Sequence, residues 1–318
     1  MPTFVFMKQA LLSLFFFCAL HAVAQERKYF DWEWKPCEQS LARFISLTES
    51  TDSGWLKKDF YTATKKLLMR GLYKDSACKI KNGWFRYYYA NEQVSSFGRY
   101  VNGEKDGLWL SWHFNGMMKD SVVYNLGRPG SITAWHSNGY MADSSVYSED
   151  GNAIHLYWFD NGTISHGGQS YRGKKEGEWK YFHKNGQPAA LEVYKYDELI
   201  SRVYYNETGM QLADTSNRDR PSAFKGGNKK WRSYLMDNLD FLDGVKLLNT
   251  FFVTVVVAVT IDEAGNITDA YIDVPVSPAF DKQALKVLQR SPAWQPAVSH
   301  NRNIRSFHKQ PITFGRVD

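Results

Sequence analysis

Short runs of aromatic and β-branched residues alternate with polar turns through the middle of the chain. The segment 177–198 reads GEWKYFHKNGQPAALEVYKYDE, in which two such runs flank Asn185-Gly186. Asn-Gly is a strong signal for a tight hairpin turn, because both residues tolerate positive φ. Gly-bounded turns come next, as in GEKDG at 103–107 and GKKEG at 173–177. This pattern predicts antiparallel strands joined in sequence order by two alternating kinds of turn.

The pattern returns at steps of 23 or 24 residues. The turn position is held by Asn91, Asn115, Asn138, Asn161 and Asn185, and then by Thr208-Gly209. An aromatic residue stands three positions earlier each time: Tyr88, Trp112, Trp135, Trp158, Phe182 and Tyr205. A fixed period of this size indicates a repeat architecture, in which several hairpins together bury one continuous apolar face. We therefore expect an antiparallel β-meander.

The aromatic and histidine positions of the repeats have two interpretations each. The aromatic residues either stack as a structural ladder or form a face that binds carbohydrate or peptide. His113, His136 and His183 share another repeat position, which raises the question of a metal site. Equivalent residues in successive repeats lie roughly 10 Å apart, whereas ligands of one zinc ion all lie about 2 Å from it. The sequence therefore predicts no metal site.

Two segments carry a resemblance to a known repeat family. These are GLWLSWHFNG from Gly107 and GEWKYFHKNG from Gly177. They resemble the bacterial variant of the MORN repeat, G-x-W-x-x-Y-x-x-N-G. The resemblance covers residues 83–212, and LLMRGLYKD at 67–75 looks like a leading half-repeat. It implies a β-sheet scaffold used for association rather than a catalytic centre.

The periodic pattern ends at a polar segment, DTSNRDRPS at 214–222, which is typical of a linker. Beyond it, Trp231, Leu235, Leu239 and Leu242 have helical spacing, and FFVTVVVAVTI at 251–261 predicts a buried strand. A turn, a strand over 267–274 and a helix starting at Pro278 follow. A final strand is expected from about Ile304 to Phe314. This order predicts a small α+β domain.

This last region resembles the C-terminal domain of the TonB energy transducers over residues 223–315. The matching pieces are AFKGG from Ala223, VTIDEAGNITDAYI from Val259, SPAFDKQALKVLQRSPAWQPA from Ser277 and HKQPITF ending at Phe314. One departure is Lys225, where relatives commonly have Pro. The resemblance implies a periplasmic domain that grips a short segment of an outer-membrane transporter.

The final strand is the predicted binding site for that partner. A strand with a free edge has unpaired backbone groups, to which an extended peptide adds as another strand. Arg305, Phe307, Lys309 and Thr313 are expected on this edge strand. The alternatives are that the strand closes the fold without binding anything, or that it pairs with a second copy.

The N-terminus has the features of an export signal. Lys8 precedes an apolar run over 10–20, and Ala22-Val23-Ala24 forms a small-x-small cleavage site before Gln25. The alternative, a retained inner-membrane anchor, is disfavoured because a spanning helix needs about 20 apolar residues. Cleavage leaves Cys37 and Cys78, which in an exported protein are a candidate disulfide; the alternative is two buried thiols. Such a bridge would contribute roughly 4 kcal/mol in the chain-entropy description.

Composition and charge argue against several classes of function. The chain has 318 residues and a net charge of +6, and no long Lys/Arg run concentrates that charge, which argues against nucleic-acid binding. The motifs of serine hydrolases, zinc proteases and phosphate-binding loops are missing from the sequence. We therefore expect a protein that is not an enzyme and that has no cofactor.

The sequence as a whole predicts an exported, periplasmic binding protein. The expected divisions are a signal peptide at 1–24, an N-terminal cap at 25–66, repeats at 67–213, a linker at 214–222 and a TonB-like domain at 223–318. The expected partner is an outer-membrane transporter or another envelope protein. Membrane association and self-association stay open. The alternatives are a membrane-anchored energy transducer, although its Pro-rich spacer is missing, and a structural envelope protein that acts through its repeats.

Overall fold

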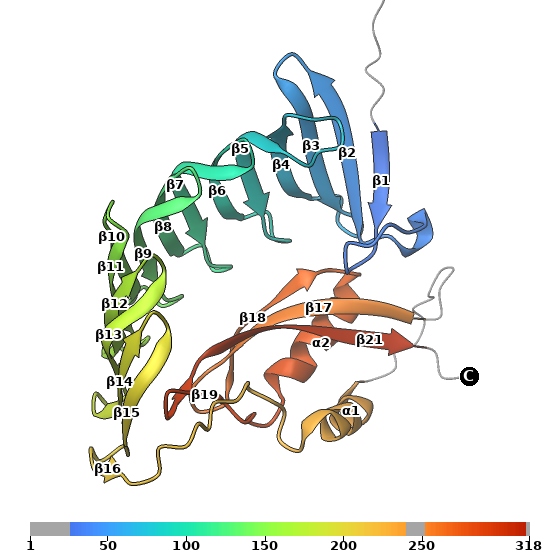
Figure 1. The fold of residues 1–318 in the computed structure, drawn as a ribbon. Helices are drawn as coiled ribbons and strands as arrows, with labels where there is room; N and C mark the ends of the chain where they lie inside the picture. The colour runs from blue at the N-terminus through green and yellow to red at the C-terminus, as the bar shows by residue number, and fades with distance from the viewer. Residues whose placement is uncertain (1–25, 240–251, 316–318) are drawn as a thin grey trace, which may run out of the picture.

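The computed structural model describes residues 26–239 and 252–315 (Figure 1). The predicted signal peptide, together with Leu242 and Phe251, lies outside the described residues. Among the helices that are described, none has the length and apolar character needed to cross a membrane.

Within the described residues, sixteen antiparallel strands in chain order form one long sheet, which confirms the predicted meander. The strands are β1 (Glu26–Phe30), β2 (Phe44–Thr51), β3 (Gly54–Tyr61), β4 (Leu67–Tyr73), β5 (Lys81–Tyr88), β6 (Val94–Val101), β7 (Glu104–Trp112), β8 (Met118–Asn125), β9 (Arg128–Trp135), β10 (Met141–Tyr147), β11 (Asn152–Trp158), β12 (Ile164–Tyr171), β13 (Lys174–Phe182), β14 (Pro188–Lys195), β15 (Glu198–Tyr205) and β16 (Gln211–Leu212). A short 3-10 helix, η1 (Gln39–Leu41), follows β1. Strands β1 to β3 belong to this same sheet, so it extends into the segment expected as a cap.

The asparagine at each turn has a different role from the one its sequence suggests. Gly116 has a positive φ of 84°, but Asn115 is not among the residues with positive φ. Instead, the Asn115 side chain accepts a hydrogen bond from the amide of Met117 and donates one to the carbonyl of Ser137, at 2.8 Å, in the next turn. Asn91, Asn138, Asn161 and Asn185 make the same kind of bond to the following turn. The asparagines therefore tie neighbouring repeats together.

The histidine positions also connect successive repeats. The Nε2 atoms of His113, His136 and His183 lie 2.8, 2.9 and 3.0 Å from the carbonyl oxygens of the strand ends one repeat further on. Because a carbonyl oxygen only accepts, Nε2 must carry the proton in each case. Tyr89 fills the equivalent position, and its hydroxyl donates to the carbonyl of Trp112.

Buried tryptophans fill the inner, concave face of the sheet. The Trp109 ring is 3% exposed and its indole donates to the carbonyl of Arg99 at 2.9 Å. Gly98 lies directly beneath this ring, and a Cβ placed there would come within 2.1 Å of it. Trp179 repeats this arrangement over Gly168. The glycines in these strands are therefore required by close packing.

The C-terminal part is the predicted small α+β domain. Its sheet has the strand order β18-β17-β21. The elements are α1 (Gly227–Asn238), β17 (Phe252–Ile261), β18 (Ile267–Val274), α2 (Pro278–Gln289), β19 (Ala297–Ser299), β20 (Arg302–Ile304) and β21 (Ser306–Gly315). The helices cover one face of the sheet, around Val255, Val257, Val259 and Leu288. The small hairpin β19–β20 was not predicted, and it makes the final strand begin two residues later than expected.

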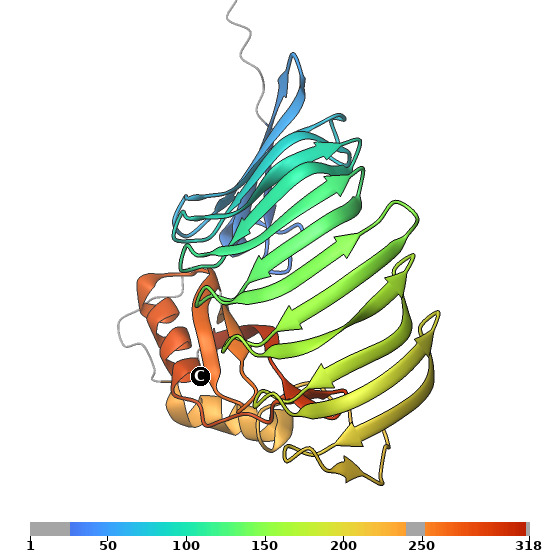
Figure 2. The ribbon, with the colours of Figure 1, turned by 90° about the vertical axis from the view of Figure 1, so that its left-hand side faces the viewer.

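The long sheet curves around the C-terminal domain (Figures 1 and 2). At one end, Phe44 and Tyr61 of the sheet form a buried cluster with Val256 and Val274 of the domain. In the middle, the ring of Tyr271 stacks on Phe114 at 4.4 Å. At the far end, the Asn301 side chain donates to carbonyls of β14 and β15. The domain is thus docked along the sheet from β2 to β15.

The structure shows Cys37 and Cys78 as free thiols rather than as the predicted disulfide.

Candidate partner-binding edge

Strand β21 forms one edge of the C-terminal sheet. It pairs with β17 over its whole length, from Ser306 opposite Ile261 to Gly315 opposite Phe252. No strand among the described residues pairs with its other edge. The backbone groups along that edge are therefore open to an added strand, in the geometry by which extended peptides join a sheet.

Pro311 shows which residues turn their backbone outward. Proline has no N–H group, so it is found in edge strands where its nitrogen faces away from the ladder. Because the direction alternates along a strand, Phe307, Lys309 and Thr313 share the outward direction of Pro311. The close approach of the Thr313 and Thr254 hydroxyls, at 2.9 Å, fits a pair whose backbone groups point away from each other.

The two side-chain faces of β21 differ. Ile312 is fully buried, and Phe314 packs against Phe280 of α2 with ring centroids 4.9 Å apart. On the other face Phe307 is 56% exposed, and Lys309 forms an ion pair with Asp273 of β18 at 2.8 Å. The strand is thus anchored through one face, while the predicted residues Phe307, Lys309 and Thr313 lie on the other.

Arg305 requires a correction. It precedes β21 and is not part of the edge strand. Its side chain forms an ion pair with Asp160 in a turn of the long sheet, and Asp160 also pairs with Lys184 at 2.6 Å. Hydrogen bonds from Lys184 and the charge of Arg305 lower the pKa of Asp160, despite the opposing effect of burial. Arg305 therefore holds the two parts of the molecule together.

The end of the linker supports the start of the edge strand. The Ser222 hydroxyl lies 2.7 Å from that of Ser306 and 2.5 Å from Nε2 of His308. Burial lowers the pKa of His308, which favours the neutral ring in this contact. These bonds fix the first residues of β21 through their side chains.

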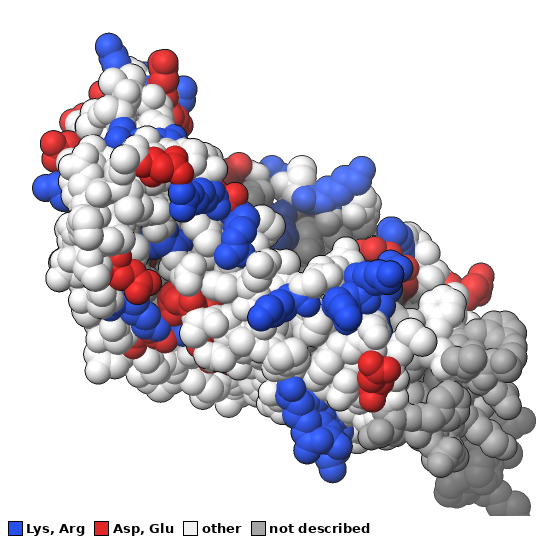
Figure 3. Space-filling model, turned by 90° about the horizontal axis from the view of Figure 1, so that it is seen from below, with Lys and Arg blue, Asp and Glu red and all other residues white. Residues whose placement is uncertain are grey.

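Charged side chains of both signs share the lower face of the molecule. Basic side chains form several clusters there, and acidic ones lie between them (Figure 3). On this face, positive charge therefore does not form one continuous patch.

Sequence comparisons bear on the C-terminal region. Residues 253–315 match the family described as Gram-negative bacterial TonB protein C-terminal, a family of protein-interaction domains in energy transduction. This match supports the predicted TonB-like domain and indicates a TonB-type role in the envelope or in transport. No match to the MORN family was found for the long sheet, although its regular meander is consistent with repeats. No curated protein matches the chain.

Proposed function

We propose that this protein is an exported, periplasmic binding protein that captures an extended segment of an outer-membrane transporter or another envelope protein. The segment would add to β21 as a fourth strand of the C-terminal sheet. The observation that supports this most is the outer edge of β21, with which no described strand pairs, in a region that matches the TonB C-terminal family. This role requires no covalent chemistry and no cofactor.

The long sheet has a supporting role in this proposal. Its turns and strand ends hold the C-terminal domain through the Arg305–Asp160 pair, the Tyr271–Phe114 stack and the cluster around Val256. These contacts involve β18, the central strand β17 and the segment before β21. No described strand pairs with the outer edge of β21 while the domain is docked. The long sheet would therefore hold the binding strand in a fixed position.

Strand addition can be tested at Lys309, because its backbone N–H points in the same outward direction as the backbone nitrogen of Pro311. Lys309→Pro removes one outward N–H but leaves the ladder to β17 intact, whereas Lys309→Ala keeps that N–H. Both variants lose the ion pair with Asp273, so they form a matched pair. A photo-crosslinker at Phe307, used in cells, should capture a membrane-protein partner with Lys309→Ala and lose at least tenfold of that yield with Lys309→Pro. Equal capture by two folded variants would exclude strand addition.

Export of the protein to the periplasm is tested by a separate experiment. N-terminal sequencing of the protein purified from its native cells should give a mature chain that starts at Gln25. A retained N-terminus would instead support the membrane-anchored transducer, which is the alternative form of the same binding function.

A further inference from the structure

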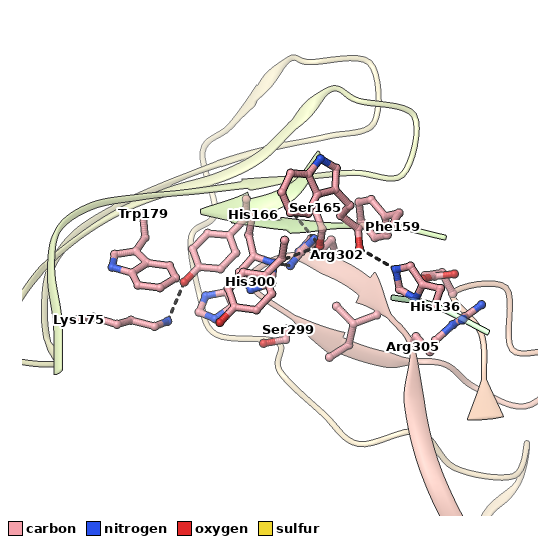
Figure 4. A pocket seen from close by; sticks show the side chains of 15 residues that line it. His136, Phe159, Ser165, His166, Lys175, Trp179, Ser299, His300, Arg302 and Arg305 are labelled. Atoms are coloured by element: carbon pink, nitrogen blue, oxygen red, sulfur yellow. Dashed lines mark hydrogen bonds between the residues drawn. The ribbon is translucent and has the colours of Figure 1, made fainter. Parts of the chain in front are cut away.

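A cavity of about 440 Å³ lies between the long sheet and the β19–β20 hairpin (Figure 4). The sheet contributes Lys175, Trp179 and His166 to its wall, and the hairpin contributes His300 and Arg302. Its volume falls within the range of small-molecule sites, about 300–1,000 Å³. Strand β21 does not line this cavity, so it is separate from the partner-binding edge.

Arg302 is the most buried charge in the wall, with 6% of the residue exposed. One terminal nitrogen donates to the carbonyls of Ser165 and Phe182, at 2.9 and 3.0 Å, and the other lies 3.2 Å from Nδ1 of His166. Its Nε has no hydrogen-bond partner within the described parts of the chain. Nε is itself buried, so it does not open onto the cavity. Arg302 therefore brings to the wall a guanidinium whose partners are carbonyl, hydroxyl and imidazole groups rather than a carboxylate.

The uncompensated charge of the cavity is positive. Lys175 donates to the Tyr181 hydroxyl at 2.7 Å and lies over the Trp179 ring. The ion pairs of the described residues include neither Lys175 nor Arg302. The two carboxylates near them are already engaged, because Glu263 pairs with Lys184 at 2.8 Å and the buried Glu192 bonds to Nδ1 of His300 at 2.7 Å. Burial, followed by the charges of Arg302, His300 and Lys175, lowers the pKa of His166 to about 3. The same surroundings would favour a bound anion.

The aromatic rings help to place the two cations. Tyr157, His166, Tyr181 and His300 stack in one column, with successive centroid separations of 4.1, 5.6 and 3.8 Å. Lys175 and Arg302 both lie over the Tyr181 ring, at 5.3 and 5.5 Å from its centroid. Both positive charges are therefore held near the same ring of the cavity wall.

We propose that this cavity binds a small organic anion, with its carboxylate or phosphate group held by Arg302 and Lys175. Because one wall belongs to the long sheet and the other to the C-terminal hairpin, the ligand would bridge the two parts of the molecule. This site is independent of strand addition at β21.

Binding is measured on the full mature chain by calorimetry and by the fluorescence of Trp158 and Trp179, which line the cavity. The probes are inorganic phosphate, glucuronate and neutral glucose. We expect saturable binding of phosphate or glucuronate that weakens with salt, and no binding of glucose. The stronger of the two anionic probes distinguishes a phosphate ligand from a carboxylate. If neither anion saturates at millimolar concentration, or if glucose binds equally well, the proposal is wrong.

The repeats provide a matched control for the variant. Lys81 donates to the Tyr87 hydroxyl at 3.0 Å and lies over the Tyr100 ring, as Lys175 does with Tyr181 and Tyr194, but Lys81 is not part of the cavity wall. Lys175→Met should weaken anion binding at least tenfold, and Lys81→Met should leave it unchanged. Equal effects of the two substitutions would show that the cavity is not the binding site.

Discussion

At the scale of single residues, side chains at the turns do more than shape the turn in which they stand. Each repeat asparagine bonds within its own turn and also to the next one, as Asn138 does with Tyr140 and Asp160. The sequence predicted the turn position correctly. It could not show the second bond, because that bond joins residues 22 positions apart whose spacing depends on the folded sheet.

The asparagine bonds should have a measurable effect on stability. Asn138→Ala removes the 2.7 Å bond to the Asp160 carbonyl, so we expect it to lower the free energy of unfolding by about 1 kcal/mol. The measurement is urea denaturation. Asn125→Ala, at an exposed position in β8, is the control and should change stability by less than about 0.5 kcal/mol. Equal losses in the two variants would contradict this role.

His166 should make stability depend on pH. Its folded pKa is lowered by burial to about 3, while the unfolded value is 6.5. Between these values the unfolded chain binds a proton and the folded protein does not, so the free energy of unfolding falls as the pH drops from 6.5 toward 3. Denaturation at pH 7, 5.5 and 4.5 should show a smaller fall for His166→Gln than for the unaltered protein. Parallel pH profiles would exclude this contribution.

At the scale of strands and helices, the period of 23 or 24 residues predicted the meander, and the strand over 267–274 and the helix from Pro278 were also predicted. The β19–β20 hairpin was missed because each strand has three residues. Its turn, His300-Asn301, has φ values of 50° and 60°. An asparagine in a two-residue polar turn was the available signal, but the short strands around it have too few apolar residues to form a pattern.

The glycines beneath the tryptophans give a prediction at this scale. A Cβ at Gly98 would lie 2.1 Å from the Trp109 ring, so Gly98→Ala should lower the free energy of unfolding by about 1–3 kcal/mol through overpacking. Gly130 is the matched control, because its nearest neighbour would be 3.8 Å away. Chemical denaturation of both variants checks this. A tolerated Gly98→Ala would mean that the ring moves aside easily.

At the scale of the whole molecule, the main finding is that the C-terminal domain is docked inside the curve of the long sheet (Figure 2). No pattern along the chain indicated this docking. Contacts such as Arg302 with Ser165 or Ser137 with Asp269 join residues more than 130 positions apart. The sequence separations of these contacts do not follow the repeat of 23 or 24 residues. The cavity and the role of Arg305 both depend on this docking, and for that reason the sequence could not reveal them.

Asp160 provides a test of the docking. It binds both Arg305 and Lys184 and is about one-fifth exposed. We expect Asp160→Asn to weaken the docking and to speed up tryptic cleavage within the linker at 214–222 several-fold, because opening of the interface frees that segment. Asp150→Asn, in an exposed turn whose bonds are local, serves as the control. Unchanged cleavage rates would assign the interface stability to its apolar contacts.

The breadth of that docking has a mechanical consequence. If a captured partner pulled on β21, the tension would pass through β17 and β18 and then into contacts distributed along the long sheet from β2 to β15. Because many contacts would share this force, no single contact would have to bear all of it. The docked domain would then resist extension, whereas a flexible linker would stretch.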